Sequence, residues 1–164
     1  MLITDATSGL GRYLAQEFAQ AGWDVLVHGR DHGRVGDLCA DLGGARGYVA
    51  DPAWLADVTK LAARIRAEAP RLDVLVNNAG IGFGAPRDGR QVSGDRHELR
   101  FAVNYLAPVL LTRLLVPALP QHLPPALPSI SSPGIAPASH LRAAPGPPPS
   151  VAVLGRAVPR SPLQ

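Results

Sequence analysis

The chain has 164 residues, the usual size of one domain and enough to bury a hydrophobic core. Hydrophobic residues make up 46% of it and charged residues only 18%, which excludes a disordered, highly charged polymer. A single cysteine excludes a disulfide framework and a cysteine-based zinc site, and it favours a reducing compartment. The first residues lack the basic segment of a signal peptide. We therefore expect a cytoplasmic protein without a metal site.

Charge and proline both divide the chain near residue 119. All 13 acidic residues lie at or before Glu98, so the net charge of +3 comes from three arginines after residue 140. Of 17 prolines, 13 fall between Pro117 and Pro162, and proline rules out both a helix and a central strand there. We predict an ordered domain over residues 1–119 and an irregular, low-complexity tail over 120–164. Because the excess charge belongs to the tail, we expect no nucleic-acid surface.

The first 119 residues alternate between strand-like and helix-like patterns. The predicted strands cover residues 2–4, 23–27, 47–50 and 72–76, and the predicted helices cover 10–21, 31–42, a segment opened by Pro52, and 95–116. Leu10, Leu14, Phe18 and Ala21 fall on one face of the first helix, and Cys39 falls on the core face of the second. The apolar stretch 101–119 contains Asn104 and Arg113, which favours a buried helix over a membrane span. Four βα units predict an α/β fold with a doubly wound, parallel, Rossmann-like sheet.

The loop after the first predicted strand has the composition of a phosphate-binding turn. It includes Ser8-Gly9-Leu10-Gly11, directly before an amphipathic helix. Glycines at positions 9 and 11 would let backbone N–H groups approach a pyrophosphate at the helix N-terminus, where the helix dipole favours negative charge. A G-x-G sequence also occurs in ordinary turns, and it is the flanking strand and helix that favour the nucleotide interpretation.

The segment His28-Gly29-Arg30-Asp31 follows the second predicted strand, where dinucleotide-binding domains select their cofactor. A carboxylate there would bind the ribose 2′-hydroxyl of NAD, whereas the guanidinium of Arg30 fits the 2′-phosphate of NADP. We therefore expect NADP(H) to be preferred over NAD(H). The alternative is that Arg30 is a solvated loop residue and Asp31 the N-cap of the next helix.

Four elements together resemble the short-chain dehydrogenase/reductase family over about residues 1–119, the cofactor-binding part of a typical member. They are Thr4-x3-Ser8-Gly9-Leu10-Gly11, Asp51 after the third strand, Asn77-Asn78-Ala79-Gly80 after the fourth, and Asn104 within Val103-Asn104-Tyr105. The resemblance implies hydride transfer between a nicotinamide dinucleotide and a small carbonyl or alcohol substrate. Relatives commonly associate through the helix that corresponds to 95–116, which makes a homo-oligomer an expectation.

The resemblance also implies roles for single residues, each with a simpler alternative. Asp51 would accept a hydrogen bond from the adenine amino group, or serve as an N-cap, and the two roles are compatible. Asn77, Ala79 and Gly80 would shape the wall beside the cofactor ribose, where the alternative is a plain turn. Asn104 would hold a water of the proton relay, or be a polar residue satisfied within its helix.

Departures from the family pattern put activity in doubt. Asp5 replaces the first glycine of the loop, and a carboxylate about 5 Å from a phosphate would cost on the order of 3 kcal/mol. No tyrosine is followed four residues later by lysine, the pair that supplies the family's proton donor. Ser132 matches the carbonyl-polarising serine weakly, and a plain turn is the alternative.

Three functions therefore stay open from the sequence. They are a catalytically impaired reductase, a non-catalytic dinucleotide-binding protein, and an interaction protein that acts through its proline-rich tail. A change of reading frame near residue 118 in GC-rich DNA would account for the change in composition.

Overall fold

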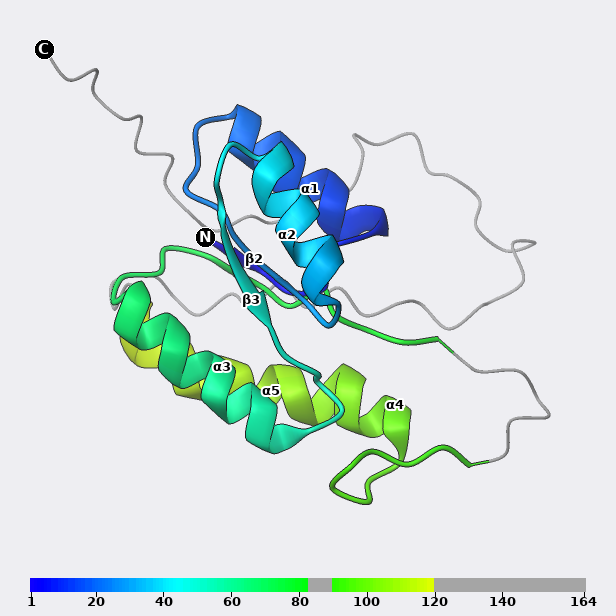
Figure 1. Cartoon of the computed structure of the whole chain (residues 1–164). Coiled ribbons are helices and arrows are strands. Elements are labelled where there is room, and N and C mark those ends of the chain that lie inside the picture. The colour runs from blue at the N-terminus through cyan, green and yellow to red at the C-terminus, as the bar shows by residue number, and fades with distance from the viewer. Residues whose placement is uncertain (83–89, 120–164) are drawn as a thin grey trace, which may run out of the picture.

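The computed structural model describes residues 1–82 and 90–119 (Figure 1). Its elements are β1 (Leu2–Ile3), α1 (Gly9–Gln20), β2 (Leu26–Gly29), α2 (His32–Asp41), β3 (Arg46–Val49), α3 (Leu55–Glu68), β4 (Leu75–Val76), α4 (Leu99–Phe101), the π-helical turn η1 (Ala102–Leu106), α5 (Ala107–Leu115) and the 3-10 turn η2 (Val116–Ala118). The predicted tail 120–164 lies outside the described residues.

The four strands form one parallel sheet in the order β3-β2-β1-β4. Helices α1 and α2 cover one face of the sheet, and α3 and α5 cover the other (Figure 1). Strands β1, β2 and β4 are buried along their whole length, as expected for strands with helices on both sides. The predicted doubly wound, Rossmann-like α/β fold is confirmed.

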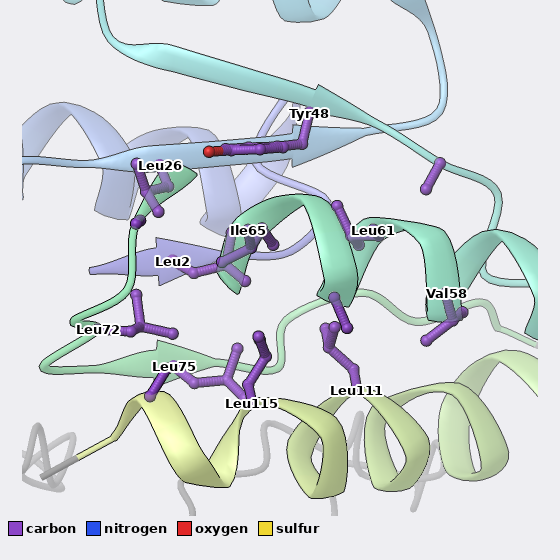
Figure 2. Close-up of a cluster of buried hydrophobic side chains, with 14 of the residues drawn as sticks. Leu2, Leu26, Tyr48, Val58, Leu61, Ile65, Leu72, Leu75, Leu111 and Leu115 are labelled. Atoms are coloured by element: carbon purple, nitrogen blue, oxygen red, sulfur yellow. The ribbon is translucent and has the colours of Figure 1, made fainter. Parts of the chain in front are cut away.

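Alternation along the strands divides the core into two layers. Leu2 and Leu26 point toward α3 and α5, where they meet Ile65, Leu111 and Leu115 (Figure 2). The neighbouring strand residues point the other way and pack under α1 and α2, in a cluster that contains Ile3, Val27, Val35, Leu38 and Val76. Successive strand side chains face opposite sides of a sheet, so each two-residue step supplies both layers. Packing on both faces holds the parallel strands in place, and their carboxyl ends meet at the same edge of the sheet.

The segment Leu99–Ala118 is long and apolar enough to cross a membrane by length and composition alone. In the structure it contributes Ala107, Leu111 and Leu115 to the core shared with α3. Cys39 is half-buried and packs against the other core layer, and burial raises the pKa of its thiol. Both segments therefore supply the core side chains that were predicted for them.

Three elements begin three residues later than predicted: β4 begins at Leu75 and not at residue 72, and β2 and α3 begin late because a turn takes the place of their first residues. Strand β2 begins at Leu26, since the Trp23 N–H bonds the carbonyl of Phe18 and the two rings pack edge to face at 5.6 Å. Helix α3 begins at Leu55, not at Pro52, since the residues before it form a separate turn. The carboxylate of Asp95, from a distant loop, accepts the N–H of Leu55 at 2.7 Å. A side chain remote in sequence thus caps this helix.

Two further expectations about helices fail. Leu10 is 50% exposed and Ala21 is also exposed, because α1 approaches the sheet through the small buried residues Gly11 and Ala15. The helix expected over 95–116 begins only at Leu99 and passes through the π-helical turn before α5. Such turns inside helices often occur at functional sites, and this one contains Asn104.

Candidate active site

The carboxyl ends of the strands form the floor of a crevice, as in other open α/β sheets. A pocket lies there, and its lining includes Asp5, His28, Arg30, Pro52, Ala79 and Gly80. A second, smaller and more apolar pocket shares His28, Pro52 and Ala79 with it and extends toward α3 and α5. Segments far apart in the sequence are therefore brought to one place.

The loop between β1 and α1 has two residues with left-handed backbone conformation, Asp5 at φ 50° and Gly9 at φ 52°. A Cβ on Gly11 would lie 2.4 Å from the carbonyl oxygen of Asp5, so α1 can approach the loop only with glycine there. Ser8 is the N-cap of α1, but its side chain makes no cap hydrogen bond within the described residues. The N–H groups of the first helical turn are thus left for an anion.

Thr4 joins this loop to the Asn-Asn-Ala-Gly segment after β4. The buried Thr4 hydroxyl accepts the N–H groups of Asn78 and Ala79, both at 2.9 Å, and lies 3.2 Å from the carbonyl oxygen of Val76. In return, Nδ2 of Asn78 donates to the carbonyls of Thr4 at 2.9 Å and Asp5 at 3.1 Å. The two loops therefore form one hydrogen-bonded unit, which a plain turn at 77–80 would not require.

Asn77 occupies the end of β4 and is 8% exposed. Its Nδ2 donates to the hydroxyl of Thr112 at 3.0 Å, which ties the strand to α5. Its buried Oδ1 has no hydrogen-bond partner within the described part of the chain, and the residue lines the apolar pocket. Asn77 therefore leaves one acceptor at the floor of the crevice.

Arg30 and Asp31 differ in their contacts. Oδ1 of Asp31 accepts the N–H of Arg34 at 2.9 Å and caps α2, as the alternative interpretation of this residue predicted. Arg30 is exposed at the mouth of the larger pocket, and among residues 1–82 and 90–119 it forms no ion pair. A Cβ on Gly29 would lie 2.6 Å from Cγ2 of Thr7, so close packing requires glycine there. The guanidinium is thus left for a ligand.

Asp51 follows β3 at the edge of the crevice. Its Oδ1 accepts the N–H of Ala53 at 2.9 Å, inside the turn that precedes α3. The predicted N-cap role is therefore wrong in detail, because Trp54 is the N-cap residue of α3. The contact to the turn occupies Oδ1 and fixes the direction of the carboxylate, while the adenine role stays a prediction.

Asn104 holds the chain that follows the glycine of the Asn-Asn-Ala-Gly segment. Its Oδ1 accepts the N–H of Ile81 at 2.8 Å and its Nδ2 donates to the carbonyl of Ile81 at 2.9 Å. Both polar atoms of the Asn104 side chain are therefore bonded to the main chain of Ile81. The role of Asn104 in a proton relay stays a prediction.

Two residues of the site were missed by the sequence analysis. Asn78 lies inside the recognised motif, but its role in holding the Asp5 loop depends on contacts across the sheet. His28 is 3% exposed, and it bonds both the loop after β1 and the end of β3. Burial lowers the pKa of its imidazole, more strongly than the nearby carboxylates of Asp5 and Asp51 raise it. Its position was the one indication in the sequence, since His28 is a titratable residue directly after the predicted strand 23–27.

The tyrosines of the chain lie away from the crevice. Tyr48 is fully buried under the guanidinium of Arg64, 5.0 Å from the ring centroid, and Tyr105 is exposed and stacks on Phe101 at 5.2 Å. Neither pocket has a tyrosine or a lysine in its described lining. Ser132 lies outside the described residues.

Comparison with known proteins agrees with this arrangement. The model of the short chain dehydrogenase family matches residues 1–132. The chain belongs to the short-chain dehydrogenase/reductase family. It is 36% identical to retinol dehydrogenase 14 of Mus musculus in an alignment of 148 positions that covers 80% of this chain and 43% of the relative. It is 35% identical to dehydrogenase/reductase SDR family member 7B of Xenopus laevis in an alignment of 129 positions that covers 73% of this chain and 39% of the relative.

Solved structures of family members superpose on about 71% of the chain. A metagenomic short-chain oxidoreductase in complex with NADP gives a TM-score of 0.61 at 30% identity, over 71% of this chain and 54% of the other. An RhlG/NADP active-site complex from Pseudomonas aeruginosa gives 0.62 at 28% identity, over 71% and 46%. The chain therefore spans about half, or less, of the proteins that it matches.

Proposed function

We propose that this chain binds NADP(H) at the carboxyl edge of its sheet, as the cofactor-binding part of an oxidoreductase. The observation that carries the proposal is the joined pair of loops, in which Thr4 and Asn78 hold the glycine turn against the Asn-Asn-Ala-Gly segment. The uncapped first turn of α1 would hold the pyrophosphate, and Arg30 would bind the 2′-phosphate. Two solved relatives that superpose on the fold contain NADP.

The residues present fit a dinucleotide, with one exception. Gly11 allows close approach of loop and helix, and Ala79 and Gly80 leave space on the opposite wall. Asp5 lines the same pocket with a negative charge, which opposes a phosphate. We therefore expect binding that is weaker than a glycine at position 5 would give.

When bound, the nicotinamide would supply or accept a hydride from a small carbonyl or alcohol substrate. This chain's own residues would orient the cofactor: Asp51 at the adenine amino group, and Asn77, Ala79 and Gly80 beside the ribose. Asn104 would hold a water of the proton relay. Because no Tyr-x3-Lys pair occurs in the 164 residues, we propose that this chain does not turn over substrate at a rate typical of the family.

The test of cofactor preference is a fluorescence titration with NADPH and NADH. Arg30→Ala should weaken NADPH by about tenfold and NADH by much less, since only NADPH carries the 2′-phosphate. Arg66→Ala, which removes an exposed arginine in the last turn of α3, is the matched control and should change neither affinity. Equal losses of both cofactors in Arg30→Ala would show that Arg30 does not bind the 2′-phosphate.

A non-catalytic dinucleotide-binding role is the second candidate, and Asp5 together with the missing Tyr-x3-Lys pair favours it. Binding of cofactor without turnover would identify this role.

We also propose association of two copies through the helical segment 99–116, whose outer side exposes Phe101, Tyr105, Val109 and Val116. Sedimentation of the full chain tests this association, which a monomer at micromolar concentration would contradict. We further propose that the protein is cytoplasmic and has no nucleic-acid or membrane partners.

A further inference from the structure

His28 connects three segments of the cofactor site, although its side chain is buried. Its Nδ1 accepts the N–H of Asp5 at 3.3 Å, and its Nε2 lies 3.1 Å from the carbonyl oxygen of Ala50. The main-chain carbonyl of His28 also accepts the N–H of Ala6 at 2.8 Å. A backbone N–H can only donate and a carbonyl can only accept, so the ring must carry its proton on Nε2. One residue thus holds two consecutive N–H groups of the loop after β1.

The loop needs such support at Asp5. Its φ of 50° lies in the left-handed region, which glycine adopts freely and other L-residues adopt at a cost. The family pattern has a glycine at this position, and here an aspartate follows the same turn. The N–H of Asp5 is bound by His28 and its carbonyl by Nδ2 of Asn78 at 3.1 Å. Contacts on both sides of the residue therefore fix the turn.

We propose that His28 is a positioning residue of the dinucleotide site, which holds the left-handed turn at Asp5, in the loop between β1 and α1, in place of the glycine that position 5 lacks. The inference rests on the proposed function, because the cofactor would bind the N–H groups that this loop presents. His28 itself need not touch the cofactor, since its ring atoms are occupied by Asp5 and Ala50. Its effect would be on affinity, through the shape of the loop.

The same geometry makes the site sensitive to acid. Protonation of Nδ1 converts an acceptor into a donor, so the ring N–H and the N–H of Asp5 would oppose each other. The carboxylates of Asp5 and Asp51 face the ring and favour its protonation, and Arg30 lines the same pocket. Helices α3 and α5 contribute apolar residues to the pocket on the other side of the ring. Burial lowers the pKa of His28, which keeps the imidazole neutral at neutral pH.

A double-mutant cycle on the full chain tests the link between positions 28 and 5. His28→Leu should weaken NADPH binding at pH 8 by about tenfold when position 5 is aspartate. In the Asp5→Gly background the same change should cost less than about threefold, because glycine adopts the turn unaided. His28→Asn, whose Oδ1 can replace Nδ1 as acceptor, should retain most of the affinity. His97→Leu is the control at an exposed histidine. Equal losses in both backgrounds would overturn the proposal.

The pH dependence provides a second test, which remains usable where His28→Leu fails to fold. The affinity for NADPH should fall in both proteins as pH decreases from 7 to 5, because the 2′-phosphate gains a proton, and it should fall more steeply in the natural chain than in His28→Asn. An affinity that rises in acid, or the same pH profile in both proteins, would contradict the proposal. Without any cofactor, the 15N–1H resonance of the Asp5 amide should titrate together with the ring of His28.

The resonance of the Asp5 amide distinguishes a failure of the proposed function from a failure of the proposed role of His28. A titrating Asp5 resonance without NADPH binding at any pH would overturn the proposed function and leave the contact of His28 with Asp5 standing. NADPH binding together with an Asp5 resonance that ignores the ring would overturn the role of His28 and leave the proposed function standing.

Discussion

Residues 4–11 follow β1 and residues 77–81 follow β4, so the two loops lie side by side at the carboxyl edge of the sheet. The second loop has the Asn-Asn-Ala-Gly sequence and is held by Thr4 and Asn104. The first departs from its pattern at Asp5, yet it follows a regular turn because His28 and Asn78 bind both sides of that residue.

The difference shows that each loop obtains its shape from side chains of other segments. A departure inside such a loop can therefore be accommodated in geometry, while its charge still acts on whatever binds there. For this chain, structure and affinity should respond differently to changes in the two loops, and the following predictions use that difference.

The largest expected effect concerns turnover. Both loops can be correctly formed and this chain should still fail to reduce carbonyls, because general acid–base help is typically worth about 10²–10⁴-fold and no Tyr-x3-Lys pair occurs in the 164 residues. Consumption of NADPH by purified protein over a panel of aldehydes, ketones and quinones measures this. Robust turnover that persists in Asn104→Ala and Ser132→Ala would show that a different catalytic group is present.

The charge at position 5 should have the next largest effect. Asp5→Asn keeps the size of the side chain and its tolerance of left-handed backbone, and it removes the negative charge. We expect NADPH and NADH to bind roughly ten- to a hundredfold more tightly, since both carry the pyrophosphate. Isothermal titration at two salt concentrations gives the comparison. An unchanged affinity would mean that the carboxylate of Asp5 points away from the bound phosphates.

The contact between the two loops can be broken at Gly11. A Cβ there would lie 2.4 Å from the carbonyl oxygen of Asp5 and 2.5 Å from Nδ2 of Asn78. Gly11→Ala should therefore lower the free energy of unfolding by about 1–3 kcal/mol and weaken cofactor binding. Gly36→Ala is the matched control, because nothing lies within 4 Å of its Cβ and α2 should gain about 0.5–1 kcal/mol. Urea unfolding measures the free energy of unfolding of both variants, and an equal change in the two would contradict this prediction.

Much of this arrangement could be predicted from the sequence, because the parallel fold depends on periodic apolar residues and the motif depends on fixed spacing. The parallel sheet, the cap at Asp31 and the burial of the apolar segment 101–119 follow from such local patterns. Roles of His28, Asn78 and Asp95 could not be predicted, since each binds backbone groups that are 22 to 74 positions away. The exposed position of Leu10 escaped for a related reason, because a small-residue face can replace a large apolar one where a helix lies close to a sheet.

Thr4 should have a smaller effect on stability than Gly11. Thr4→Val removes the hydroxyl that accepts the N–H groups of Asn78 and Ala79 and leaves both without this partner. We expect a loss of about 1–2 kcal/mol in the free energy of unfolding, most of it regained in Thr4→Ser, which keeps the hydroxyl. Hydrogen exchange at the amides of Asn78 and Ala79 should accelerate in Thr4→Val. Unchanged exchange would mean that the second loop is held chiefly by Asn104.

The smallest effect is a dependence of stability on pH that originates at the first loop. Burial lowers the pKa of His28 in the folded chain, whereas an unfolded histidine titrates near 6.5. Below about pH 6.5 the unfolded state therefore binds a proton that the folded state does not. The contribution of His28 to stability is fully present above that pH and is lost as the pH falls through the pKa of the folded state.

Urea unfolding of the natural chain and of His28→Asn between pH 5 and 8 measures this contribution. The amino group of Met1, whose pKa burial also lowers, titrates in both proteins and cancels in the difference. The difference in the free energy of unfolding should therefore be constant above pH 7 and should shift against the natural chain in acid. A difference that stays constant down to pH 5 would mean that the loop accepts a charged imidazole, and the hydrogen bond from Asp5 to His28 would not control its shape.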